Sequence, residues 1–247
     1  MKKWFAYGAI FLCVYFTFVV ATVPATLVTN WISIPKNIAV SGISGTIWQA
    51  KATSVSHPQI TLNDVDIELG VMSLLKGDPL LELSFGGALF AGPEGSLSIS
   101  GLLDELKIEN GEMSIAANDI AKQLALPVPL TAHGYVSIKV PEFVIGQPIC
   151  KEASGQIVWN KASITALEEK INLGALKADV TCEQGALAIA LSPSNDLGLT
   201  FTAYLRGKGN VSGNGYLTPG AKFPEQLKAA LPFLGKADNK GRYRLSL

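Results

Sequence analysis

The sequence predicts a mainly β protein: a single N-terminal transmembrane helix, then a long antiparallel, curved β-sheet or sandwich-like domain with two or three short helices. Three observations predict this fold. Residues 4–35 contain no charged side chain, many later segments alternate apolar and polar residues, and a phrase built around a tryptophan occurs twice. The first predicts a membrane segment, the second half-buried strands, and the third a domain made of two related halves.

The N-terminal segment is expected to anchor the chain in a membrane. Residues 4–30 are uncharged, and roughly 20 apolar residues in a helix span the hydrocarbon core of a bilayer. Lys2 and Lys3 precede this run. Because basic residues stay on the cytoplasmic side, we expect residues 1–3 to form a cytoplasmic stub and the rest of the chain to lie across the membrane.

Tryptophans mark the two ends of this segment. Trp4 and Trp31 are candidate interface anchors, since tryptophan is enriched where a bilayer meets water. Pro24 is expected to end or kink the helix. A cleaved signal peptide is the alternative, but its apolar core normally has about 7–15 residues and a clear small-residue cleavage site follows it. The run here is longer and lacks such a site, so we expect an uncleaved, single-pass anchor.

The chain has three cysteines, and two of them can pair outside the cytoplasm. Cys13 lies within the apolar run and is interpreted as a small apolar residue. Cys150 and Cys182 lie in the region expected beyond the membrane, where a disulfide is permitted and where they can pair only with each other. We expect this bridge; the alternative is two unpaired thiols in the core.

Period-two alternation predicts that most of the chain from about residue 36 forms half-buried antiparallel strands. It occurs in GSLSIS (95–100), YVSIKV (135–140), ALAIALS (186–192), GLTFTAYLRG (198–207) and GRYRLSL (241–247). The phase changes between Leu62 and Val65, which predicts a bulge at Asn63-Asp64. Helical signals, with capping residues and prolines at the ends, occur at 118–126 and 223–234, and a single turn is expected within 70–77.

A repeated phrase predicts that the domain is duplicated. SGISGTIWQAKA (41–52) resembles SGQIVWNKASIT (154–165), and similar pieces follow both in the same order. We therefore expect a first half over 36–145 and a second half over 146–247. Trp48 and Trp159 then occupy equivalent strands, where they pack in the sheet; the alternative is that they are exposed anchors for a partner.

Few side chains in the sequence suggest catalysis. His57 and His133 stand alone rather than in a paired metal spacing. The chain has no G-x-S-x-G elbow and no P-loop, and the Gly-rich residues 206–215 lack the strand-turn-helix setting of a phosphate loop. We expect no enzyme activity, no catalytic residues, no cofactor and no metal.

The charge pattern excludes one class of partner and leaves another open. The formal net charge is zero, so no overall field attracts nucleic acid. Lys240, Arg242 and Arg244 form a small basic cluster near the end of the chain. This cluster either meets an acidic patch on a partner or belongs to a charged strand that discourages edge pairing.

The order of these features resembles a known family. A short basic start and an apolar run are followed by Gly45-Thr46-Ile47-Trp48, then by LLKGDPLLEL (74–83), the two-cysteine region and LPFLGKADNKGRYRLSL (231–247). This order resembles the type II secretion system protein N family, also called general secretion pathway protein N.

The resemblance implies a single-pass inner-membrane protein of a Gram-negative bacterium, with a cytoplasmic N-terminus and a β-rich periplasmic domain. Its implied role is to help export folded proteins from the periplasm across the outer membrane. The implied partners are other components of the apparatus in the inner membrane, with the outer-membrane secretin as a further candidate. The family implies no catalytic residue.

The sequence is compatible with two other functions. A curved sheet with an apolar face could hold acyl chains, which would make the protein a periplasmic lipid-binding β-groove protein in envelope lipid handling. Alternating strands serve a dry core and a lipid groove equally well. The other possibility is an enzyme without a recognisable motif.

Overall fold

The structure is a computed structural model that describes residues 2–27, 35, 37–58, 60–87, 91–102, 105–123, 130–166 and 168–247, without the side chains of residues 2, 3, 5 and 6. The chain divides into two compact units, Met1–Ala91 and Gly92–Leu247. The two related halves expected over 36–145 and 146–247 remain a prediction.

The first unit begins with helix α1 (Lys2–Ala21). Apolar side chains are exposed along it, and Trp4 is 83% exposed. The helix ends at Ala21 rather than near residue 30 because Pro24 has no N–H with which to continue it. Among the described residues no helix is both long and apolar enough to cross a membrane, so the structure does not support the transmembrane anchor expected over residues 4–30. Trp31 lies outside the described residues.

The remainder of the first unit is a small antiparallel sheet. Its strands lie in the order β1-β3-β4-β5, and β2 also pairs with β3. The elements are β1 (Ala39–Ser41), β2 (Ser44–Gly45), β3 (Gln49–His57), β4 (Ile60–Leu69), helix α3 (Val71–Leu75) and β5 (Leu80–Phe85). The short helix α3 connects β4 to β5 and confirms the turn expected within 70–77.

The bulge expected at Asn63-Asp64 is not an inserted residue. Ala52 lies opposite Val65 and Ser54 opposite Asn63, so the register of β3 and β4 is the same on both sides. Asp64 has a φ of 48° instead, in the left-handed region that Asp tolerates better than most residues. The phase of the side chains therefore changes without an extra residue, and Val65 is buried.

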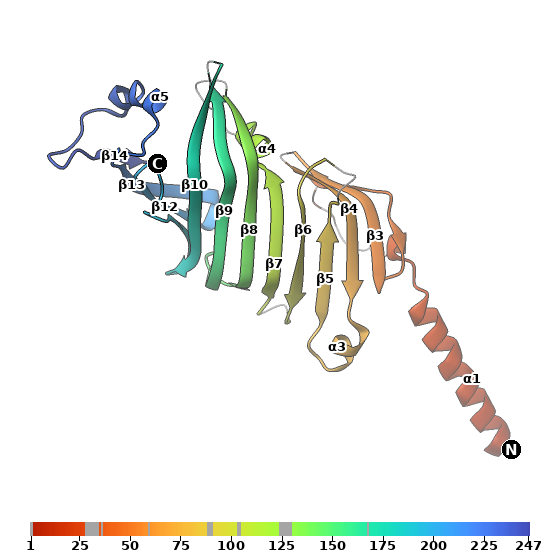
Figure 1. Cartoon of the computed structure of the whole chain (residues 1–247). Helices are drawn as coiled ribbons and strands as arrows, with labels where there is room; N and C mark the ends of the chain where they lie inside the picture. The colour runs from red at the N-terminus through yellow and green to blue at the C-terminus, as the bar shows by residue number, and fades with distance from the viewer. Residues whose placement is uncertain are drawn as a thin grey trace. The chain divides into compact units, whose positions relative to one another are not determined.

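The second unit is a longer antiparallel sheet in which each strand pairs with the next in the chain. In Figure 1, β8 to β10 run side by side while β12 and β13 lie across them, so the sheet of this unit curves. Its strands are β6 (Glu94–Ser100), β7 (Lys107–Ala116), β8 (Leu130–Ile145), β9 (Cys150–Ala166), β10 (Glu169–Glu183), β11 (Ala186–Leu191), β12 (Leu199–Arg206), β13 (Asn210–Leu217) and β14 (Tyr243–Ser246).

The register gives this second sheet one apolar and one polar face. Val136 of β8 lies beside Trp159 of β9, which lies beside Leu176 of β10. On the other face, Lys139 of β8 pairs with Glu112 of β7 at 2.9 Å. The alternation that predicted half-buried strands is confirmed here, and each unit holds one antiparallel sheet rather than two sheets packed face to face.

Short helical segments cover parts of the apolar face. Helix α4 (Ala117–Ala121) belongs to a buried cluster with Ile115, Ala132 and Val136. The C-terminal segment, with α5 (Glu225–Lys228) and the 3₁₀ helix η2 (Leu231–Leu234), covers a second cluster. The buried members of that cluster are Ala162, Ile171, Leu173, Leu197, Leu217 and Phe223. Removing this apolar surface from water is the main driving force for the packing.

The predicted helices are present but shorter than the sequence ranges that predicted them. Residues 117–121 are helical and overlap the expected range 118–126, of which residues 124–126 are not described. Pro224 precedes α5 as its cap instead of occupying the first helical position, and Pro232 lies inside η2. A further 3₁₀ turn, η1 (Gly207–Gly209), connects β12 to β13.

Candidate functional site

The end of α1 is hydrogen-bonded to the segment around Trp48, one of the two similar tryptophan-containing segments. In a continuing helix, the N–H of residue 24 would bond to the carbonyl of Val20, but Pro24 has no N–H. The indole Nε1–H of Trp48 donates to the Val20 oxygen instead, at 2.9 Å. Two further links fix this junction: Ile47 N–H donates to Val23 O at 3.0 Å, and Pro24 forms an isolated bridge with Thr46.

The sequence before Trp48 creates the turn that places the indole. Gly45 has a φ of 85°, and a Cβ at this position would lie 2.2 Å from the carbonyl oxygen of Gln49. Only glycine fits there. The Trp48 carbonyl accepts from Leu69 N–H at 2.8 Å, so the same residue connects the helix end to strand β4.

An open cavity of about 410 Å³ lies at this junction. Its lining includes Ala21 from the end of α1, Trp48, Gly70, Val71, Leu80 and the carboxylates of Glu68 and Glu82. Among the described residues that line it there is no His, Cys or Ser. Lys51 pairs with Asp66 nearby on β3 and β4, and this hydrogen bond raises the pKa of the ammonium group.

Trp159 has a different role from Trp48. Its Nε1–H donates to the carbonyl of His133 at 2.9 Å, next to a break in the register between β8 and β9. The ring packs against both buried clusters of the second unit. The prediction that both tryptophans pack in a sheet therefore fits Trp159, whereas Trp48 mainly connects the helix to the sheet.

The disulfide lies at one end of the second unit. Cys150 begins β9, Cys182 lies near the end of β10, and the two are bonded. Cys150 is 1% exposed. The turn before β9 is also held to the turn after β10, because Ile149 N–H donates to the Gly185 carbonyl at 3.1 Å. Cys13 is free and exposed on α1.

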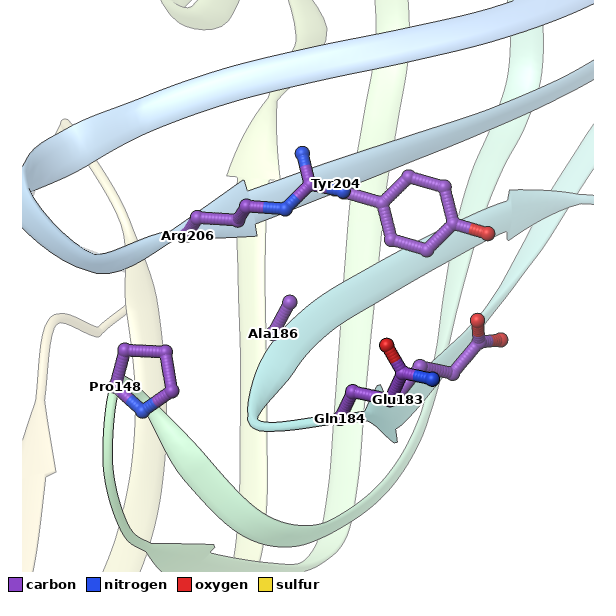
Figure 2. Close-up of a pocket in the computed structure, with 6 residues that line it drawn as sticks. All are labelled: Pro148, Glu183, Gln184, Ala186, Tyr204 and Arg206. Carbon is purple, nitrogen blue, oxygen red and sulfur yellow. The ribbon is translucent and has the colours of Figure 1, made fainter.

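A second open cavity, of about 600 Å³, lies at the end of the second unit where Pro148 and Glu183 are found (Figure 2). It is lined by Pro148, Glu183, Gln184, Ala186, Tyr204 and Arg206. Arg206 donates to the hydroxyl of Ser212, and its guanidinium carbon lies 5.3 Å from the centre of the Tyr204 ring. Glu183 faces this pair across the cavity in Figure 2.

The basic cluster near the C-terminus divides into two parts. Arg242 is held within its own turn: it pairs with Asp238 at 2.8 Å and lies 4.4 Å from the centre of the Tyr216 ring. Arg244 is an exposed side chain on β14, opposite Tyr216 on β13. No ion pair of Arg244 is found among the described residues.

The Asp238 turn is favoured by the ionised carboxylate. Hydrogen bonds from the backbone N–H and the side chain of Arg242 hold the pKa of Asp238 below its usual value, and the same contact raises the pKa of Arg242. Because the carboxyl pKa is lower in the folded chain than in the unfolded chain, the ionised carboxylate stabilises the fold at pH values above the unfolded-state pKa. This contribution is lost as the pH falls through the lowered pKa of the folded state.

The two histidines make hydrogen bonds to an amide and a hydroxyl. His57 Nε2 lies 3.0 Å from Asn37 Nδ2, and His133 Nε2 lies 2.8 Å from Thr165 Oγ1. Within the described parts of the chain, no three side chains among His, Cys, Asp and Glu come together as metal ligands do.

Comparison with known proteins places this arrangement in a family. A model of the family "Type II secretion system (T2SS), protein N" matches residues 36–246. The chain belongs to the type II secretion system protein N family. The match covers the strands of both units, from the segment before β1 to the last strand, and no solved structure matches the chain.

Relatives within the protein N family match over almost their whole length. Type II secretion system protein N of Vibrio cholerae is 28% identical over 244 residues, which cover 98% of this chain and 97% of the relative. The Aeromonas hydrophila protein is 29% identical over 254 residues, 99% of this chain and 98% of the relative. The protein of Klebsiella pneumoniae is 28% identical, with 98% and 94% covered.

The sequence signals of this protein N family member located some sites and missed others. The Trp48 phrase, the two cysteines and the C-terminal basic residues all occupy defined positions in the structure. Lys2 and Lys3 begin α1, and their side chains are not described. The bond from Trp48 to Val20 and the cavity at Tyr204 and Arg206 were not predicted, because each joins segments that are far apart in sequence.

Proposed function

We propose that this chain is a non-enzymatic component of the type II secretion system. It acts at the inner membrane, to which its N-terminal segment attaches, and its β-rich units work in the periplasm. There it helps to export folded proteins across the outer membrane through contact with other components of the apparatus. The observation that carries this proposal is the family match over residues 36–246.

Membrane attachment is supported by the character of α1. Residues 4–35 carry no charge, and large apolar side chains on different sides of the helix are exposed. Ile10 is 60% exposed, Phe11 70% and Leu12 53%, and successive residues of a helix point about 100° apart. A helix that is apolar all round is not covered by its own domain, so a lipid phase is the natural environment for it.

Contact with partners is supported by the free edge at β14. Leu247 N–H donates to Gly213 O at 2.9 Å. Because backbone groups alternate in an antiparallel strand, those of Arg244 and Ser246 point away from β13. No described strand pairs on that side. An extended partner segment can add there as a further strand, and an acidic one would complement Arg244.

Loss of the protein should disturb an assembly rather than a reaction. We expect deletion of the whole chain to lower secretion of the host's exported hydrolases, which should accumulate in the periplasm while their synthesis stays normal. Hydrolase activity in medium, periplasm and whole-cell fractions measures this, and re-expression of the chain is the control. Unchanged secretion in the deletion strain would refute the proposed role.

The β14 edge can be tested by reversing one charge. Arg244→Glu is expected to reduce secretion at an unchanged protein level, because the exposed side chain makes no described ion pair and its new charge would repel an acidic partner strand. Lys177→Glu on the central strand β10 makes the same charge reversal at an exposed position whose strand is paired on both sides. Equal secretion by the two variants would contradict partner addition at β14.

A second candidate function is lipid binding by the second unit. The observation that favours it is the apolar face of its sheet, where Ile138, Ile157 and Ile189 are only half-buried. Mass spectrometry of lipids extracted from the purified chain distinguishes the two functions. Stoichiometric phospholipid, together with normal secretion but altered envelope lipids in the deletion strain, would favour the groove.

A further inference from the structure

Helix α3 exposes apolar side chains and turns its polar residue inward. Val71 is 47% exposed, Met72 71%, Leu74 44% and Leu75 77%. Ser73, in the middle of the helix, donates its hydroxyl to Gly70 O at 2.7 Å and accepts from Leu80 N–H at 3.1 Å. This arrangement is the reverse of the usual one, in which apolar residues of a surface helix face the core.

The hydrogen bonds show that this exposure is built into the fold. Besides the two bonds of Ser73, Gly70 N–H donates to Leu80 O at 2.9 Å, and Asp78 N–H donates to Ser73 O at 3.1 Å. These bonds close the connection between β4 and β5 at its base. The exposed apolar patch at 71–75 is therefore held in place, and clustered apolar residues on a surface mark a site of interaction.

The patch lies beside the end of α1. Val71 and Gly70 line the same cavity as Ala21, the last residue of α1, and Trp48. Trp48 bonds to the Val20 carbonyl, so the end of the helix is fixed to the sheet that carries α3. Two apolar elements, α1 and the patch, thus meet at one end of the first unit.

We propose that α3 inserts its exposed apolar side chains into the surface of the phospholipid membrane to which α1 attaches. This inference rests on the membrane attachment proposed above and adds a second contact. An interfacial segment typically buries its apolar face about 5–10 Å into the boundary between headgroups and acyl chains. Lys76, the single charged residue within 70–77, can extend its ammonium group to the headgroups.

A lipid surface fits the patch better than a protein partner does. The patch is a short helix of five residues. It lies at the same cavity as the end of the apolar α1, so one bilayer can contact both elements. Insertion at two points would fix how the first unit is oriented on the membrane, since a single helix leaves the attached domain free to rotate.

The depth of α3 can be measured on the full chain by spin labelling. In a Cys13→Ser background, without reductant so that Cys150–Cys182 stays bonded, Met72→Cys and Leu75→Cys each carry a nitroxide. Phe233→Cys is the matched control, because Phe233 is an apolar side chain 90% exposed in the second unit. The labelled chains are reconstituted in vesicles of phosphatidylethanolamine and phosphatidylglycerol, and collisions with oxygen and with a water-soluble nickel complex are compared.

We expect the nitroxides at residues 72 and 75 to collide mainly with oxygen, and to collide with nickel several-fold less often than the nitroxide at residue 233. If the chain co-floats with the vesicles but both labels collide with nickel as often as the control label, α3 does not insert into the membrane. The patch would then be a surface for a protein partner. If the chain does not float with the vesicles, the membrane attachment in the proposed function is wrong, and the inference falls with it.

Discussion

Replacement of Trp159 by alanine is expected to lower the free energy of unfolding of the second unit by about 3–5 kcal/mol, the usual cost of deleting a large aromatic side chain from a packed site. The ring contacts both buried clusters of the unit, so its removal leaves a cavity between them. The change also leaves the carbonyl of His133 without the indole donor that lies 2.9 Å away.

Urea denaturation followed by circular dichroism measures this effect on the purified full chain. Trp159→Phe keeps most of the packing but loses the hydrogen bond, so it should cost only about 1 kcal/mol. Trp4→Ala is the surface control and should have no effect, since Trp4 is 83% exposed on α1. A Trp159→Ala variant as stable as the wild type, but unable to support secretion, would make Trp159 a partner surface instead.

The alternating segments could be predicted from sequence because a half-buried strand imposes its period directly on the residues. Leu199, Phe201 and Ala203 on β12, for example, face one side of the sheet and pair with alternate residues of β13. The pairing of neighbouring strands follows from short turns, which leave an antiparallel neighbour as the nearest partner. These local rules account for most of the sheet in both units.

Long-range contacts could not be predicted in the same way. The phrase around Trp48 resembles the one around Trp159, so the sequence suggested one role for both residues. The difference arises from Pro24, which removes a helical hydrogen bond and leaves Val20 O free for the Trp48 indole. The hydrogen-bond partners of the two tryptophans differ because the partner of Trp48 lies in the N-terminal segment.

The local conformation at Asp64 shows another limit of pattern analysis. The change of phase between Leu62 and Val65 was detected correctly, but an inserted residue and a left-handed residue produce the same change. The structure has the second, with Asp64 at a φ of 48° and the register unbroken. Periodicity therefore located the irregularity without identifying its cause.

Loss of the Cys150–Cys182 bridge is expected to lower the free energy of unfolding by about 3–4 kcal/mol, as the chain-entropy model gives for a loop of this length. The two residues are separated by 32 positions. The bond connects the start of β9 to the end of β10 and thereby restricts the long β9–β10 hairpin in the unfolded chain. It also lies at the end of the second unit where the cavity lined by Pro148 and Glu183 is found, so the shape of that end depends on it.

Cys182→Ser should reduce the steady-state level of the protein in cells and shift its urea denaturation midpoint downward, because an unfolded chain is exposed to proteolysis. Cys13→Ser is the matched control: it removes the one free cysteine and should change neither measurement. Thiol labelling of the denatured, unreduced full chain tests the bond directly. One reactive thiol, that of Cys13, is expected; labelling of all three cysteines would show that the bridge does not form, and the stability expected from it would then have to come from the packing of β9 and β10 alone.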